Sequence, residues 1–374
     1  MKVAFLGAFD PAYPRTRVLE EGLRARGVEV TLLAQPPRAR PVVREARLLG
    51  AWIARSAGAD AFLVPSFGHR DVPFAALLAR VSGVPLLFDP LVSRWDTQVR
   101  DLGRVRERSL AARRLRASDR MALRAADLVL CDTWEHGDFF GGSFGVPRSR
   151  IARIPVGADH EAFARGASRA ASRAPRAAGA PLEVVYVGGF LPLHGMPAIV
   201  EAAAILEARH GAGFARFTLI GGGMMEHRVD RDVAARGLRS VRRVARVPYG
   251  EALGRLVAAD VALGIFGATE KAARVVPHKV YQALALGVPV VTRRSRAIAE
   301  FFRDGEHLVA IPPGDGPALA RALETLAADP TRAAAIGAAG RAAALAVGTP
   351  ERIGDALVEA IGRARALTAP RIRR

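Results

Sequence analysis

One lysine stands out among the residues of this sequence that have the potential to do chemistry. The 374 residues include 55 Lys and Arg, yet only Lys2, Lys271 and Lys279 are lysines. Lys279 lies in VVPHKVYQALALGVPVVT, residues 275–292, at the start of a predicted buried helix that leads into a predicted buried strand. The first turn of a helix favours acidic side chains over basic ones. A lysine there indicates an anionic partner, with a solvated lysine at a helix start as the alternative.

Two glycine-rich segments follow other predicted strands and suit contact with the same anion. The segment VGGFLPLHGMPAIVEAA, residues 187–203, ends a strand and opens a helix, whose free N–H groups and positive dipole end favour phosphate. A second segment, FTLIGGGMMEH at 217–227, ends its strand in three glycines. A tight turn that needs glycine only for its backbone is the alternative for the first segment. The candidate contacts are Gly188, Gly189, Gly195 and Gly222.

Charged residues also follow predicted strands in the first half of the chain. In GAFDPAYPRTRVLEEGL, residues 7–23, Arg15 is a candidate to bind a phosphate or carboxylate of a second substrate. An exposed arginine without such a role is the alternative. The other candidates on this side are Arg17, Asp89, Asp96 and His136, and the residues alone do not choose among them.

Apolar runs that alternate with helix-length segments predict the fold class. The first series lies at residues 2–7, 28–34, 60–66, 84–89 and 127–132, and the second at 182–189, 217–223, 241–247, 260–266, 288–292 and 307–313. Strands that are apolar on both faces and alternate with helices indicate a parallel sheet covered on both sides. The sequence thus predicts an α/β protein with two doubly wound domains, residues 1–163 and 182–346. Ligands of such sheets bind at the carboxyl ends of strands, where the candidate residues lie.

Two segments outside these domains have their own signatures. Residues 164–181, ARGASRAASRAPRAAGAP, contain no acid and no large apolar residue, which predicts a linker or exposed loop. In the last segment, residues 347–374, Thr349 is the predicted N-cap and Pro350 the first helical residue. An apolar stripe at Ile353, Leu357 and Ile361 predicts that this helix covers a surface, which we expect on the first domain.

Composition excludes several classes of protein. One cysteine, Cys131, rules out a disulfide framework, and the eight histidines show no spacing for a metal site. No P-loop and no G-x-G-x-x-G motif occurs, which argues against an ATPase or an NAD enzyme. The start of the sequence shows no signal peptide and no apolar run long enough to span a membrane, so we expect a cytoplasmic protein. The net charge of +19 comes without interleaved aromatic residues, so nucleic acid is not an expected partner.

One basic segment raises the question of a membrane surface. Residues 100–124 carry nine arginines interspersed with leucine and valine. A basic amphipathic helix of this kind binds anionic lipid and would make the protein peripheral on the inner face of the membrane. A solvated helix face in an arginine-rich protein is the alternative.

The second half of the chain resembles glycosyltransferase family 4. VVPHKVYQALALGVPVVT corresponds to the donor-site helix of that family, VGGFLPLHG to its phosphate loop, and RIPVGADHEAF to the segment that enters its second domain. The resemblance implies the GT-B fold, with two facing Rossmann-like domains and a C-terminal helix that crosses back. It also implies transfer of a sugar from a nucleotide-diphosphate sugar with retention of configuration, without a metal or other cofactor.

Roles follow from the resemblance residue by residue. Lys279 and His194 are assigned to the diphosphate, Gln282 to the ribose, and the glycines to close backbone approach. The chain departs from the family pattern at several positions. Arg274 and Gln282 replace the two glutamates of an E-x7-E motif, and Gly189 and His194 stand where Arg and Lys are usual. Phe88 replaces a catalytic-loop histidine and leaves Asp89 as the catalytic candidate there.

These departures define a divergent subgroup and keep other functions open. A cell-envelope glycan, a lipid-linked molecule or a small molecule would be the acceptor of a transferase. A nucleotide-sugar epimerase of the same fold and a catalytically silent nucleotide-sugar-binding protein are the alternatives. The donor region lacks obvious carboxylates for epimerase chemistry. The substitutions at 189, 194, 274 and 282 are the reason to consider a catalytically silent protein.

Overall fold

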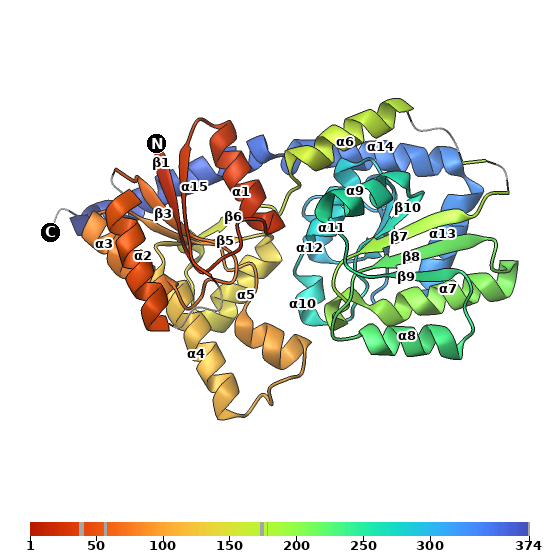
Figure 1. The fold of residues 1–374 in the computed structure, drawn as a ribbon, viewed down its shortest axis with the longest axis horizontal. Coiled ribbons are helices and arrows are strands. Elements are labelled where there is room, and N and C mark those ends of the chain that lie inside the picture. The colour runs from red at the N-terminus through yellow and green to blue at the C-terminus, as the bar shows by residue number, and fades with distance from the viewer. Residues whose placement is uncertain (37–40, 56–57, 173–175, 178, 373–374) are drawn as a thin grey trace. The chain divides into compact units, whose positions relative to one another are not determined.

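The computed structural model describes the chain except residues 37–40, 56–57, 173–175, 178 and 373–374. The described residues form two compact units, each with its own core. Unit 1 contains Met1–Asp159 and Gly348–Arg374, and unit 2 contains His160–Val347 (Figure 1).

Unit 1 is a parallel sheet in the order β2-β1-β3-β4-β5-β6. Its strands are β1 (Lys2–Gly7), β2 (Glu29–Ala34), β3 (Ala61–Val64), β4 (Leu86–Phe88), β5 (Leu128–Cys131) and β6 (Ile151–Arg153). The helices are α1 (Pro14–Ala25), α2 (Pro41–Arg55), α3 (Val72–Ser82), the π-helical turn η1 (Asp96–Asp101), α4 (Leu110–Ala125), α5 (Trp134–Phe144), the short η2 (Arg148–Arg150) and α15 (Pro350–Ile372). Residues of β1, β3, β4 and β5 are buried towards both faces, as a sheet covered on both sides requires.

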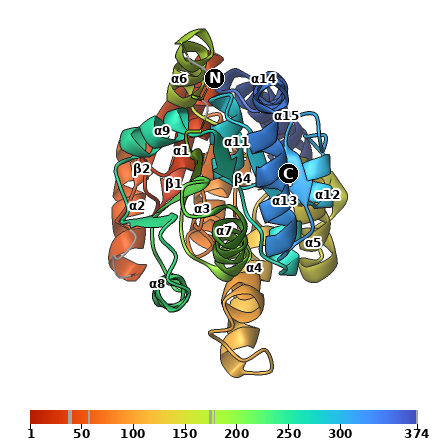
Figure 2. The ribbon, with the colours of Figure 1, turned by 90° about the vertical axis from the view of Figure 1, so that its right-hand side faces the viewer.

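Unit 2 repeats the architecture in the order β12-β11-β10-β7-β8-β9. Its strands are β7 (Leu182–Val187), β8 (Ala215–Ile220), β9 (Val241–Val244), β10 (Val261–Leu263), β11 (Val290–Arg293) and β12 (Val309–Ile311). The helices are α6 (His160–Ser172), η3 (Pro192–His194), α7 (Met196–His210), α8 (Glu226–Ala235), α9 (Tyr249–Ala258), α10 (Glu270–Ala273), α11 (His278–Ala285), α12 (Arg296–Ala299), α13 (Gly316–Ala328) and α14 (Pro330–Val347). Within this unit α7 and α13 pack side by side (Figure 2).

The two strand orders confirm the doubly wound class and locate the point where each sheet reverses. In unit 1 the order turns between β1 and β3, and in unit 2 between β7 and β10. Loops that leave the carboxyl ends of strands at such a point form the usual ligand crevice. The glycine-rich loop after β7 therefore lies where a ligand of unit 2 is expected.

Three features differ from the sequence-based expectation. The segment 164–181 does not begin as a linker or exposed loop, because α6 continues to Ser172 and contacts α9 and α11. Arg169 accounts for this, since its buried guanidinium donates to the carbonyls of Val257, Ala259 and Gly287. Strand β6 lacks a sequence signal, because one of its three residues is Arg153 and the residue before it is Arg150, so no longer apolar run marks it. The segment 100–124 is not one helix, because η1 ends at Asp101 and α4 begins only at Leu110.

The last helix returns the chain to unit 1. Thr349 caps α15 by accepting a hydrogen bond from the Arg352 amide, and the predicted stripe of Ile353, Leu357 and Ile361 is buried. The helix packs on α1 at two glycines. A Cβ atom on Gly354 would lie 2.1 Å from the Gly22 carbonyl oxygen. The two helix backbones approach too closely for any side chain at this crossing.

A pair of substitutions in α15 tests this contact. We expect Gly354→Ala to lower the free energy of unfolding of unit 1 by about 2 kcal/mol or more, because overpacking forces the two helices apart. Gly362 is exposed in the same helix, and a Cβ atom on it would have nothing within 4 Å. Gly362→Ala should therefore raise stability by about 0.5 to 1 kcal/mol through helix propensity alone. Denaturant unfolding of both variants makes the comparison, and equal effects would disprove the close crossing.

Candidate functional site

Lys279 lies in the first turn of α11 with its side chain directed into unit 2. The residue is 9% exposed, and its Nζ atom has no hydrogen-bond partner among the described residues. The nearest favourable group is the ring of Tyr186 in β7, whose centroid lies 3.8 Å from Nζ. A solvated lysine at a helix start, the alternative raised by the sequence, does not fit this burial.

The loop after β7 is shaped around this amine. Gly188 has φ +144°, and a Cβ atom on it would lie 2.6 Å from Lys279 Nζ. Only glycine adopts this backbone readily and leaves room for the amine. The Gly189 carbonyl accepts hydrogen bonds from the Tyr186 hydroxyl, at 2.7 Å, and from His194 Nδ1. The loop is thus fixed with its backbone against the lysine.

Burial sets the electrostatics of the two candidate cations. Desolvation lowers the pKa of Lys279 well below 10.5. Desolvation first, and the nearby Lys279 charge second, lower the pKa of His194 well below 6.5. Contact with an aromatic face compensates an ammonium only in part. A dianionic group at this position would supply the missing partner and raise both pKa values.

The hydrogen bond that His194 makes bears on its predicted contact with phosphate. Because its Nδ1 bonds to a carbonyl, Nδ1 carries the proton of the neutral ring, and Nε2 is then an acceptor. The neutral ring does not donate to a phosphate through Nε2. A phosphate contact requires the protonated form, which the lowered pKa disfavours until an anion binds.

Further glycines let the neighbouring loops meet. A Cβ atom on Gly195, φ +68°, would lie 2.4 Å from the backbone carbon of Phe266, which follows β10. A Cβ atom on Gly221 would lie 2.0 Å from the Gly188 oxygen. Gly222 accepts from the Phe190 amide at 2.9 Å. The loops after β7, β8 and β10 are therefore in backbone contact beside Lys279.

Gln282 lies one turn after Lys279 and is 7% exposed. Its Nε2 donates to the Tyr249 hydroxyl at 3.2 Å, so its Oε1 is the atom that remains to accept from a ligand. Arg274, at the other position of the E-x7-E pattern, forms a 3.5 Å ion pair with Glu270. Glu270 is thus the acid that lies nearest in the chain to position 274, although it does not fit the E-x7-E spacing.

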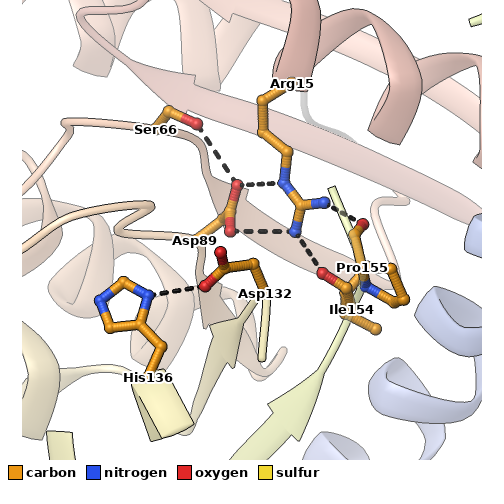
Figure 3. Close-up of polar contacts among 7 residues, drawn as sticks. All are labelled: Arg15, Ser66, Asp89, Asp132, His136, Ile154 and Pro155. Atoms are coloured by element: carbon orange, nitrogen blue, oxygen red, sulfur yellow. Dashed lines mark hydrogen bonds and ion pairs between the residues drawn. The ribbon is translucent and has the colours of Figure 1, made fainter. Parts of the chain in front are cut away.

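In unit 1, two of the sequence-predicted candidates pair with each other. Arg15 is fully buried, and its Nε and a terminal nitrogen lie 3.0 and 3.2 Å from the two Asp89 oxygens (Figure 3). Its remaining donors go to the carbonyls of Ile154 and Pro155. The alternative of an exposed Arg15 is wrong, because the side chain is buried. Its bonds to Asp89, Ile154 and Pro155 use four of the five N–H groups of the guanidinium, which argues against the predicted role as an anion ligand. Asp89 is held in the same contact and accepts from Ser66 at 3.4 Å.

The other candidates of unit 1 are also engaged. Arg17 lies 3.2 Å from Asp159 and 3.6 Å from Glu21. Asp96 is buried in η1, where its amide donates to Ser93.

His136 forms a dyad with Asp132 that the sequence did not reveal. Nδ1 of His136 lies 2.6 Å from Asp132 Oδ1, and both residues are buried after the carboxyl end of β5 (Figure 3). Thr133 caps α5 by accepting from the His136 amide at 3.0 Å, which places the histidine in the first turn of the helix. The signal was present as a four-residue spacing across a helix start. A carboxylate that orients Nδ1 leaves Nε2 to exchange protons.

The part of the chain that the structure describes holds neither a metal cluster nor a membrane span. No cluster of three or more His, Cys, Asp or Glu side chains in it is arranged to hold a metal ion. Among the same residues, every helix is too short or too polar to cross a bilayer.

Two protein-family models match the chain. A model described as a glycosyl transferase 4-like domain matches residues 10–157, and one described as glycosyl transferase-like matches residues 198–359. Among curated proteins, a GDP-mannose-dependent alpha-(1-6)-phosphatidylinositol monomannoside mannosyltransferase from Mycolicibacterium smegmatis is 31% identical over 207 residues, 54% of this chain and 53% of that protein. The chain spans about half the length of the curated relatives it matches.

Solved structures extend the likeness over the whole fold. HepE from Anabaena, solved in complex with UDP, has a TM-score of 0.69 at 16% identity and covers 97% of this chain and 100% of that one. Sucrose-phosphate synthase from Thermosynechococcus elongatus has a TM-score of 0.71 at 18% identity, with coverages of 96% and 98%. At these identities the likeness establishes the shared fold, which is the GT-B fold expected from the sequence.

The buried amine leads to a prediction about stability without ligand. Lys279→Met keeps most of the side-chain volume and removes an ammonium that has no hydrogen bond to any described residue. We expect the variant to be more stable than the parent by about 1 to 3 kcal/mol at neutral pH, because that is the scale of an unsatisfied buried group. Lys2→Met removes a lysine that is paired with Glu29 at 3.4 Å on the surface, and should change stability by less than about 0.5 kcal/mol. Thermal or denaturant unfolding decides, and a destabilised Lys279→Met would contradict the account.

Proposed function

Since the chain belongs to the glycosyltransferases with a glycosyl transferase 4-like domain, we propose that it transfers a sugar from a nucleotide-diphosphate sugar to an acceptor, with retention of configuration. The observation that carries the proposal is Lys279, a buried amine at the glycine-rich edge of unit 2 that no described residue hydrogen-bonds. Metal ions have no assigned part in it.

The diphosphate is the group that fits this edge. Breaking the bond between the sugar C1 and the diphosphate oxygen leaves the electron pair, and a growing negative charge, on that oxygen. Fixed cations and backbone N–H groups stabilise such charge most strongly in a site that excludes water. Lys279 supplies the cation, and the loop from Gly188 to Gly195 lets the backbone approach the phosphates closely.

Two further residues complete the proposed donor site. Gln282 accepts from a ribose hydroxyl through Oε1, while one N–H of its amide goes to the Tyr249 hydroxyl. His194 becomes protonated when the diphosphate binds and then donates to it through Nε2. The bonds of Gln282 to Tyr249 and of His194 to the Gly189 carbonyl support these two roles.

On the acceptor side, the geometry favours the Asp132–His136 dyad over Asp89. Asp89 is committed to Arg15, so we assign the pair a positioning role at the carboxyl ends of β4 and β6. His136, oriented by Asp132, is the group suited to take the proton of an acceptor hydroxyl. Arg17 and Asp96 stay candidates for the acceptor side, as the sequence suggests.

The acceptor class and location remain those proposed from the sequence. A cell-envelope glycan, a lipid-linked molecule or a small molecule is the acceptor, and the protein acts in the cytoplasm. The relative from Mycolicibacterium smegmatis is named for a lipid acceptor and for GDP-mannose, and HepE was solved with UDP. Exposed Leu110 and Met121 on the arginine-rich α4 support peripheral contact with anionic lipid.

Replacing the amine tests the proposal. We expect Lys279→Met to reduce sugar transfer and donor hydrolysis at least 100-fold, because an interaction with charge on the leaving group of this kind is worth about 3 kcal/mol. Lys2→Met serves as the matched control and should retain full activity. Released UDP or GDP is measured with a panel of UDP- and GDP-sugars.

Three results would decide against transfer by this site. Parent-like rates in Lys279→Met would remove the lysine from the mechanism. Binding of a nucleotide sugar without any released nucleotide would favour the catalytically silent protein. Interconversion of the sugar without release would favour an epimerase.

A further inference from the structure

A cavity of about 480 Å³ lies in unit 2 at the amino edge of its sheet. Its walls include Leu182 and Val261, the first residues of β7 and β10, and Pro289, the residue before β11. The amine of Lys279 lies against Gly188, which follows the other end of β7. The six residues of β7 separate the two edges by about 20 Å. The cavity is therefore distinct from the proposed donor site.

Small side chains on two neighbouring helices leave this space open. Thr331, Ala334, Ala338 and Arg341 of α14 line the cavity, and their spacing of three, four and three residues places them on one face of the helix. Helix α6 packs beside α14 and contributes Ala170 (Figures 1 and 2). The three alanines are exposed. Because each carries only a methyl group, the wall they form is apolar and the space between the helices stays accessible.

Arg341 brings a charge to this apolar space. Its Nε atom is buried and has no hydrogen-bond partner among the described residues. The side chain packs on Gly287, where a Cβ atom would lie 3.5 Å from Arg341 Cδ. A buried N–H group without an acceptor costs free energy, which a ligand that accepts from it would return. A hydrogen-bond acceptor is thus the group that the cavity calls for.

The other charged residues of the wall already have partners. Arg169 and Arg176 each donate to backbone carbonyls of unit 2. Asp260, the acid among the described lining residues, accepts from the Glu183 amide at 2.9 Å. With three arginines to one aspartate in this lining, the charge of the wall favours an anion.

We propose that this cavity binds a carboxylate that carries a short apolar chain, with its charged group on Arg341 and its apolar part between α6 and α14. A guanidinium offers Nε and a terminal nitrogen in the geometry from which the two oxygens of a carboxylate accept. The apolar part gains free energy in proportion to the area that it buries against the alanine methyl groups. Because Asp260 also lines the cavity, a single negative charge fits it better than a dianion. The volume is within the range of small-molecule sites, about 300 to 1,000 Å³.

Binding of octanoate to the full chain, without nucleotide or acceptor, tests the site. Saturation-transfer NMR titrations with octanoate, 1-octanol, octylamine and octyl phosphate keep the apolar chain and change the head group. We expect octanoate to bind at least tenfold more tightly than 1-octanol and octylamine, because only an anion makes a charge-assisted bond to the guanidinium. Octanoate should also bind more tightly than octyl phosphate.

Two pairs of variants locate the bound octanoate. Arg341→Met keeps an apolar chain without the guanidinium and should raise the Kd of octanoate tenfold or more. Arg332→Met removes an exposed arginine of the same helix and should leave the Kd unchanged. Ala338→Leu places a larger side chain in the cavity and should also raise the Kd tenfold or more. Ala335→Leu makes the same change at an exposed position outside the lining and should have no effect.

Several results would overturn the carboxylate site. These are no binding of octanoate to the parent, unchanged binding in Arg341→Met or in Ala338→Leu, and tighter binding of any other head group. Displacement of octanoate by UDP or GDP would also overturn it, because it would place the probe at the carboxyl edge. Lys279→Met should bind octanoate as the parent does. Since the probes contain neither nucleotide nor sugar, failure to turn over nucleotide sugars would count against the proposed function alone.

Discussion

The proposed donor site of unit 2 depends on an amine that is buried without a hydrogen-bond partner among the described residues. Lys279 enters the first turn of α11, where the helix dipole opposes a cation, and reaches a space emptied by glycine at 188. Tyr186 faces the amine with its ring and fixes the adjacent loop with its hydroxyl. A protein that keeps an unsatisfied ammonium in its interior gives up stability, and a bound diphosphate would return it. Burial thus makes the site selective for the ligand that neutralises it.

Unit 1 also buries a cation, but there the cation has partners. Arg15 is buried as deeply as Lys279, yet its donors end on Asp89 and on two carbonyls. That contact ties α1 to the ends of β4 and β6 and uses four of the five N–H groups of the guanidinium. The side chain of this unit that the proposed reaction uses is His136, which Asp132 orients. The same fold therefore holds an amine without a hydrogen bond to any described residue in one unit and a paired guanidinium in the other.

Much of the fold followed from the sequence because its signals are local. Buried runs predicted eleven of the twelve strands in the described part of the chain, and Thr349 with Pro350 marked the start of α15. The failures have physical causes. The composition of segment 164–181, rich in alanine and arginine, predicts a solvated segment. The segment nevertheless begins as a helix, in which Arg169 donates hydrogen bonds to three carbonyls of unit 2. The sequence predicts a role for Lys279 but not which groups surround its amine. Those surroundings, like the Arg15–Asp89 and Asp132–His136 contacts, depend on side chains that meet only after folding.

The central claim is that burial lowers the pKa of Lys279 in the free protein and that a bound diphosphate raises this pKa again. Between the lowered pKa of the free protein and that of the complex, the free amine has lost its proton and the bound one keeps it, so binding must take up protons and affinity must fall as pH rises. Calorimetric titration of UDP or GDP at about pH 9, in two buffers of different ionisation enthalpy, measures this uptake below the ordinary lysine pKa. The account predicts net proton uptake in the parent and its loss in Lys279→Met. Tight nucleotide binding with no proton exchange, or equal uptake in the variant, would contradict it.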